Sequence, residues 1–131
     1  MSVESFDPAA SPDALSAASI ERLLTASAHE APYFGMEQDE RMRLAGAMTA
    51  PASQWRALTE SLASDALIDL IRLLTLAEET IPGWTAGAKS PVIPLARLLK
   101  DRGDYPADLT RWIRTNSSNR FLPHGSLMDR L

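Results

Sequence analysis

Apolar residues recur at the helical period along most of the chain, and they are densest between Ser64 and Ile81. In this stretch leucine and isoleucine side chains surround a helical wheel and leave a narrow polar stripe of Asp65, Asp69, Arg72 and Glu79. A helix this apolar has to be buried on several sides. The pattern therefore predicts a central helix over Ser64–Ile81, around which the rest of the chain packs.

Shorter apolar stripes predict further helices on both sides of this one. Proline at the first helical position and Ser or Asp caps mark their starts, and Gly103 marks a left-handed end. The expected helices cover roughly residues 12–27, 37–48, 52–62, 94–102 and 106–115. No stretch alternates apolar and polar residues at the period of a strand. The sequence thus predicts an all-α protein, a compact bundle of five or six helices around the central helix.

Length and composition indicate one domain. At 131 residues the chain can bury an ordinary core. Residues 1–10 have little to bury and are expected to form a flexible arm, which leaves 11–131 as a single helical domain. The tail from Phe121 to Leu131 is irregular but rich in large apolar residues. Such a tail either packs back on its own core, which we expect, or inserts into a groove on a partner.

Several features indicate the compartment. The chain has no cysteine, and its acidic N-terminus lacks the basic and apolar regions of a signal peptide. The central helix contains Asp69 and Arg72 and is too short for a membrane span. We therefore expect a soluble cytoplasmic protein with no membrane partner.

Charge is divided unevenly along the sequence. Residues 1–81 carry five basic and thirteen acidic side chains, a net charge of −8, whereas residues 82–131 carry eight basic and four acidic ones, a net charge of +4. Such asymmetry marks a basic face for an acidic partner or nucleic acid. The plainer alternative is that the basic half docks on the acidic half of the same chain.

The loop from Gly83 to Ser90 nearly matches a phosphate-binding pattern, with Ala88 where the second glycine belongs. That motif needs a strand before it and a helix directly after it. Here a helix precedes the loop and Pro91 follows it, so we reject a nucleotide site. What remains is a weak anion-binding prediction for Lys89 and Ser90.

A second candidate is basic and aromatic and begins at Arg111. Arg111 and Arg114 lie one turn apart with Trp112 between them, and Arg120 follows. Arginines at this spacing suit carboxylate or phosphate groups, although two surface arginines beside a core tryptophan are also ordinary. Together with two apolar neighbours they form the predicted partner-binding set: Arg111, Arg114, Arg120, Phe121 and Leu122.

Catalytic chemistry has no positive signal. The two histidines, His29 and His124, have no metal-ligand spacing, and no nucleophile elbow occurs. Glu78 and Glu79 are adjacent and point about 100° apart on a helix, so we interpret them as a polar helix end rather than a catalytic pair. No catalytic residue, metal site or cofactor is predicted.

The sequence therefore favours an interaction or adaptor module, with self-association included, that contacts a protein partner through its basic C-terminal third. One alternative is a nucleic-acid-binding protein that uses Lys89, Arg97, Arg111, Arg114 and Arg120. Another is a small-molecule-binding protein or enzyme with a pocket among Tyr33, Trp55, Trp84 and Trp112.

Overall fold

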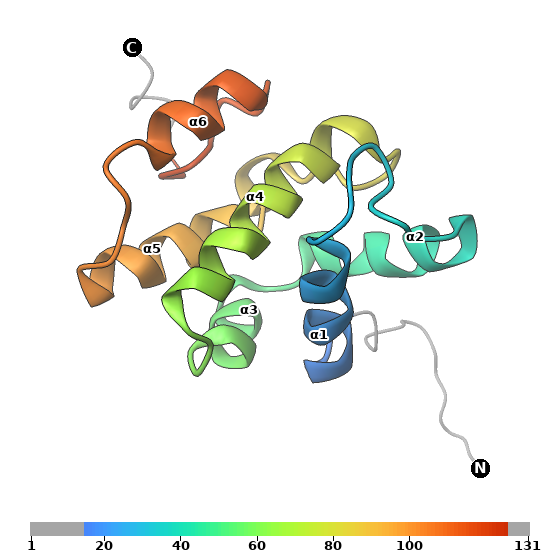
Figure 1. Cartoon of the computed structure of the whole chain (residues 1–131), viewed down its shortest axis with the longest axis horizontal. Coiled ribbons are helices and arrows are strands. Elements are labelled where there is room, and N and C mark those ends of the chain that lie inside the picture. Colours follow the sequence, from blue (N-terminus) through green and yellow to red (C-terminus); the bar gives the residue numbers. More distant parts are fainter. Residues whose placement is uncertain (1–14, 126–131) are drawn as a thin grey trace.

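A computed structural model describes residues 15–125 of the chain, and this part is entirely helical (Figure 1). Its elements are α1 (Ala17–Ala26), α2 (Gln38–Ala45), the 3-10 helix η2 (Gly46–Thr49), α3 (Ala52–Thr59), α4 (Ser64–Thr80), the 3-10 helix η3 (Gly87–Lys89), α5 (Val92–Arg102) and α6 (Leu109–Asn116). The prediction of an all-α bundle of five or six helices is confirmed. The expected arm over residues 1–10 and the end of the tail, residues 126–131, lie outside the described part.

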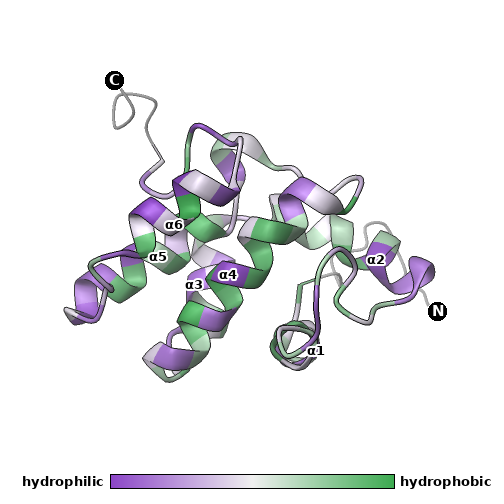
Figure 2. Cartoon of the chain, turned by 45° about the horizontal axis from the view of Figure 1, so that its top comes forward, coloured by the Kyte–Doolittle hydropathy of each residue, from purple (hydrophilic) through white to green (hydrophobic). Residues whose placement is uncertain are grey.

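Helix α4 is the centre of the bundle, as predicted. It packs against α1, α5 and α6, and Figure 1 shows it running between α1 on one side and α5 and α6 on the other. Leu67, Leu70, Ile71 and Leu74 are completely buried along it. In Figure 2 much of α2 is hydrophilic, and Leu44 is its one buried residue. The bundle thus owes its core to α4 and its neighbours.

Three helices begin at other residues than the sequence predicts, and local hydrogen bonds are found at these starts. Helix α1 begins at Ala17, where Ser16 and Ser19 form a reciprocal cap: Ser16 N donates to Ser19 Oγ at 2.6 Å and Ser19 N to Ser16 Oγ at 3.2 Å. The predicted start at Pro12 lies outside the described residues. Helix α6 begins at Leu109, and the residues from Pro106 to Asp108 form a turn instead. The predicted break before α4 and the left-handed Gly103, with φ of 77°, are confirmed.

Helix α5 also begins earlier than predicted, at Val92 rather than Pro94. Ser90 is extended, as expected next to a proline, but its hydroxyl accepts a hydrogen bond from Val92 N at 3.2 Å. Pro94 falls in the first turn, where its missing N–H leaves no partner unsatisfied. Ser90, which precedes the N-cap Pro91, thus satisfies the first backbone N–H of the helix.

After α6 the chain returns to its own core. Leu122 is only 1% exposed, and Ser118 N donates to a carboxylate oxygen of Glu79 on α4 at 2.9 Å. The tail thus packs back on the bundle as far as Gly125.

The central position of α4 predicts how two neighbouring substitutions differ. Leu70→Ala removes a completely buried side chain and should lower the free energy of unfolding by about 2–5 kcal/mol. Asp69→Ala, at an exposed position of the same helix, should change it by less than about 0.5 kcal/mol. Urea denaturation followed by circular dichroism measures both. Equal losses would contradict the central role of α4.

Candidate functional site

Helix α5 exposes one stripe of side chains. Ile93, Arg97 and Lys100 follow each other at i, i+4 and i+7; Arg97 and Lys100 are exposed and Ile93 is half-buried. The other residues between Ile93 and Lys100 are buried, and Leu95 and Leu99 are completely so. The period of the helix therefore sorts α5 into a core face and a solvent face that carries charge.

Three adjoining hollows, of about 290, 190 and 140 Å³, follow this stripe and share Ile93. The start of α3 with the residues before it lines one side, and Pro123 and His124 line the hollow nearest Lys100. We call this surface the α5 groove. Its residues are Thr49, Ala50, Pro51, Ala52, Ser53, Arg56, Ala88, Lys89, Ser90, Ile93, Pro94, Arg97, Lys100, Pro123 and His124.

The groove is positively charged. Arg56, Lys89, Arg97 and Lys100 line it, and neither Asp nor Glu is among its residues. Arg56 forms an ion pair with Asp101 at 2.6 Å. Among residues 15–125, no carboxylate forms an ion pair with Lys89, Arg97 or Lys100. Three cations therefore stand along the groove without a neutralising partner from the described chain.

This arrangement differs from a simple docking of the basic half on the acidic half. Among residues 15–125, the ion pair that joins the two halves is Arg56 with Asp101, a cation of the first half and a carboxylate of the second. The charge of the groove is thus retained on the surface.

One end of the groove is held by contacts to Lys100. Its Nζ lies 2.7 Å from Nδ1 of His124 and 5.2 Å from the ring centroid of Tyr105. Gly125 follows with φ of 88°, and a Cβ there would lie 3.2 Å from Cγ2 of Ile93. A glycine at this position therefore lets the C-terminal segment approach α5 closely.

A buried carboxylate lies behind the groove. Glu78, in the last turn of α4, is 4% exposed and accepts a hydrogen bond from the Ser90 hydroxyl. Asn119 Nδ2 donates to its other oxygen at 3.2 Å and to the carbonyl of Gly87 at 3.0 Å. The Asn119 side chain thus joins the C-terminal segment to α4 and to the loop that carries Lys89. Our interpretation of Glu78 as a polar helix end is wrong for this reason, although Glu79 is exposed.

Burial raises the pKa of the Glu78 carboxyl, and the nearby charge of Glu79 raises it further. The hydrogen bonds from Ser90 and Asn119 act in the opposite direction, since they favour the charged form. The net shift is upward, so the desolvation of the carboxylate is only partly compensated.

The predicted anion site is only partly assembled. Lys89 and Ser90 both line the largest hollow of the groove, and Lys89 is exposed. Ser90 is completely buried, however, and its hydroxyl already donates to Glu78. Lys89 is therefore the one of the two whose side chain is accessible to an anion.

The predicted partner-binding set is spread over several environments, and none of its members lines the α5 groove. Arg111 and Arg120 are exposed, whereas Arg114 and Phe121 are half-buried. Leu122 belongs to the core at 1% exposure, so its assignment as a contact residue is wrong. Lys100 and His124, which do line the groove, were absent from the prediction. The sequence did indicate Lys100, because its spacing from Ile93 and Arg97 places the three residues on one helix face.

The predicted aromatic pocket includes two core residues. Trp55 and Trp84 are completely buried, and their indole N–H groups donate to the carbonyls of Ala47 and Arg41, each at 2.9 Å. Trp112 is half-buried with the guanidinium of Arg72 5.5 Å from its ring centroid. Since two of its four aromatics have no accessible surface, the proposed pocket cannot form as predicted.

A further hollow, of about 330 Å³, lies outside the α5 groove and was not predicted. Tyr33 and Met42 line it, and these are the exposed large hydrophobic residues of the described part, at 42% and 67%. The guanidinium of Arg41 lies 3.9 Å from the Tyr33 ring centroid and donates to the carbonyl of Met36 at 2.6 Å.

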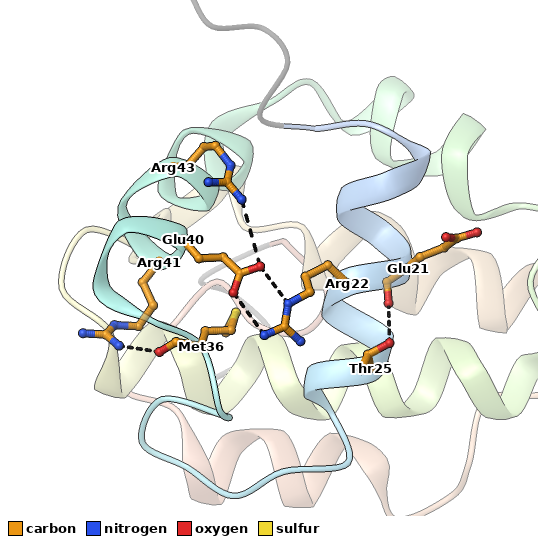
Figure 3. Close-up of polar contacts among 7 residues, drawn as sticks. All are labelled: Glu21, Arg22, Thr25, Met36, Glu40, Arg41 and Arg43. Atoms are coloured by element: carbon orange, nitrogen blue, oxygen red, sulfur yellow. Dashed lines mark hydrogen bonds and ion pairs between the residues drawn. The ribbon is translucent and has the colours of Figure 1, made fainter.

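An ion pair fixes the helix beside this hollow. Figure 3 shows Glu40 of α2 holding Arg22 of α1, with its two oxygens 2.7 and 3.0 Å from the guanidinium, and Arg43 at 4.0 Å. Helix α2 buries little, so this bidentate pair helps to hold it against α1.

Residues 15–125 contain neither a metal-binding cluster nor a membrane-spanning helix. Within this range His, Asp and Glu side chains do not cluster in a way that would hold a metal ion. Over the same residues every helix is too short or too polar to cross a membrane.

The chain matches no protein-family model, no curated protein and no solved structure. Its function is therefore argued from its own residues.

The raised pKa of Glu78 predicts a pH-dependent stability. The native state binds the proton of this carboxyl more tightly than the unfolded chain does, so this group lowers the free energy of unfolding as the pH rises from about 4 through the native pKa. Glu78→Gln removes the titration, and its stability relative to the wild type should therefore improve with rising pH over that interval. Urea denaturation at a series of pH values measures the difference.

A matched control is Glu60→Gln, at an exposed position that leaves Glu78 in place. It should keep the pH dependence due to Glu78. Parallel stability curves for the wild type and Glu78→Gln would show that this carboxyl does not titrate differently in the native state.

Proposed function

We propose that the protein is a protein-binding adaptor module that contacts its partner through the α5 groove, with cations of its basic C-terminal third. The observation that carries the proposal is the row of Lys89, Arg97 and Lys100, which lack ion-pair partners among residues 15–125 and flank a hollow with an apolar floor. Apolar area supplies binding energy, and unpaired charge supplies orientation and rapid association. The groove offers both within one surface.

The chemistry of the groove favours binding over catalysis. Its accessible polar groups are mainly cations, and the Ser90 hydroxyl is buried against Glu78. General acid–base catalysis needs a proton donor or acceptor positioned beside the substrate, and a nucleophile needs an adjacent base. His124 is the titratable candidate, but its Nδ1 is engaged by Lys100. The arrangement therefore supports recognition of a surface.

Nucleic-acid binding is the second candidate, because Lys89 and Arg97 of the predicted basic set do line the groove, beside Lys100. The other three members of that set lie elsewhere. Binding to nucleic acid would weaken steeply between low and moderate salt, since cations would replace counterions on the phosphates. This dependence separates the two candidates.

A pull-down from native lysate tests the proposal with two double charge reversals. R97E/K100E changes the groove, and R111E/R120E changes two exposed arginines of the same third outside it. We expect the wild type and R111E/R120E to retain a specific protein after nuclease treatment, and R97E/K100E to recover about tenfold less of it. Circular dichroism and melting curves establish that all three are folded.

Two results would contradict the proposal. One is loss of the protein with R111E/R120E but not with R97E/K100E, which would place the contact on α6 and the segment after it. The other is recovery that disappears with nuclease, which would favour the nucleic-acid alternative. If the captured protein is the chain itself, the adaptor is self-associating through the same groove.

A further inference from the structure

The α5 groove combines an apolar floor with a charged rim. Ile93 and Pro94 form the floor from α5, and Ala50, Pro51 and Ala52 continue it on the side of α3. The cations extend from this floor toward solvent, as long basic side chains do when their stems cover apolar surface. A ligand that fits the groove therefore needs an apolar group at its centre and negative charge around it.

The length of the groove sets the size of that ligand. A helix rises 1.5 Å per residue, so Ile93 and Lys100 are about 10 Å apart along α5, and Lys89 precedes this helix at the end of η3. An extended peptide advances about 3.3 Å per residue, so about three residues span the stretch from Ile93 to Lys100. The groove thus matches a short extended segment rather than a folded domain.

We propose that the α5 groove binds an extended acidic segment of a partner protein. An apolar side chain of that segment lies over Ile93, and carboxylates on either side of it pair with Lys89, Arg97 and Lys100. This inference rests on the proposed function and specifies the chemistry of the partner.

The nature of the floor favours a peptide over nucleic acid. Single-stranded nucleic acids bind by stacking bases on aromatic side chains along a basic track. No Phe, Tyr or Trp lines the three hollows, and the one aromatic ring among their lining residues, His124, contacts Lys100 at the end. An aliphatic floor instead matches the leucine or phenylalanine of a peptide, which gains by leaving water.

The charge of the groove also selects the partner. An acidic segment gains by pairing with cations that have no carboxylate partner among residues 15–125, whereas a basic segment would be repelled. The exposed cations are not desolvated before binding, so most of their effect is on selectivity and on the rate of association. Affinity must come from the apolar contact as well.

The test uses the full chain and fluorescently labelled probes in an anisotropy titration. The first probe is an eight-residue peptide with Leu-Phe at its centre and two acidic residues before and after the centre. The second has Asn and Gln in place of the acids, the third has Ala-Ala at the centre, and the fourth is an oligothymidylate of eight nucleotides. We expect the first to bind at least about tenfold more tightly than each of the others.

Variants then assign the binding to the groove. R97E/K100E should weaken the first peptide by about tenfold or more, whereas R111E/R120E should change its affinity by no more than about twofold. Ile93→Ala should reduce the preference for Leu-Phe over Ala-Ala, and its melting curve shows whether it is folded. This preference can be measured even if overall affinity falls.

Equal binding of the neutral peptide, or tighter binding of the oligothymidylate, would overturn the inference. So would an acidic peptide whose affinity is insensitive to R97E/K100E. These outcomes leave the proposed function to its own test, because the pull-down asks whether any protein needs the groove, whatever its chemistry.

Discussion

The burial of the Glu78 carboxylate is the constraint on which the arrangement of the basic surface depends. A buried charge is costly unless its oxygens accept hydrogen bonds, and here the donors come from Ser90 and Asn119, 12 and 41 residues away in sequence. These hydrogen bonds join the carboxylate to Ser90, which also accepts from Val92 N at the start of α5, and to the C-terminal segment through Asn119. Asn119 also donates to Gly87 in the loop that bears Lys89. The pKa of Glu78 is raised by this burial, while its hydrogen bonds hold the three segments in a defined geometry.

The α5 groove follows from that geometry together with the period of the helix. Leu95 and Leu99 commit one face of α5 to the core, which leaves Ile93, Arg97 and Lys100 on the other. The close approach of Gly125 to Ile93 and the contact between Lys100 and His124 then place the C-terminal segment along the same stripe. Basic residues of the C-terminal part thus line one groove. Among residues 15–125, no carboxylate of the acidic first half forms an ion pair with Lys89, Arg97 or Lys100.

Periodicity revealed the parts of the fold that depend on local sequence. The length of α4, the break before it and the left-handed Gly103 were all predicted, because apolar spacing and glycine act within a few residues. The exposed stripe of α5 could be predicted in the same way, from the spacing of its residues.

The hydrogen bonds around Glu78 could not be predicted from the sequence, because an acidic residue near a helix end usually faces water. Nothing in the local sequence indicates donors that are distant along the chain. Leu122 was misassigned for the same reason: its burial depends on how the tail folds back. The hollow beside Tyr33 depends on how α2 lies against Ile81 and Pro82, the residues that follow α4, and no local sequence pattern predicts that.

The most direct test of the claim that the α5 groove is the contact surface is to map binding on the isotopically labelled full chain by backbone NMR, with the acidic Leu-Phe peptide as titrant. The account predicts that the largest shift changes cluster at Lys89, Ile93, Arg97, Lys100 and His124. Changes centred on Tyr33, Arg41 and Met42 instead, or scattered evenly over all exposed cations, would contradict it.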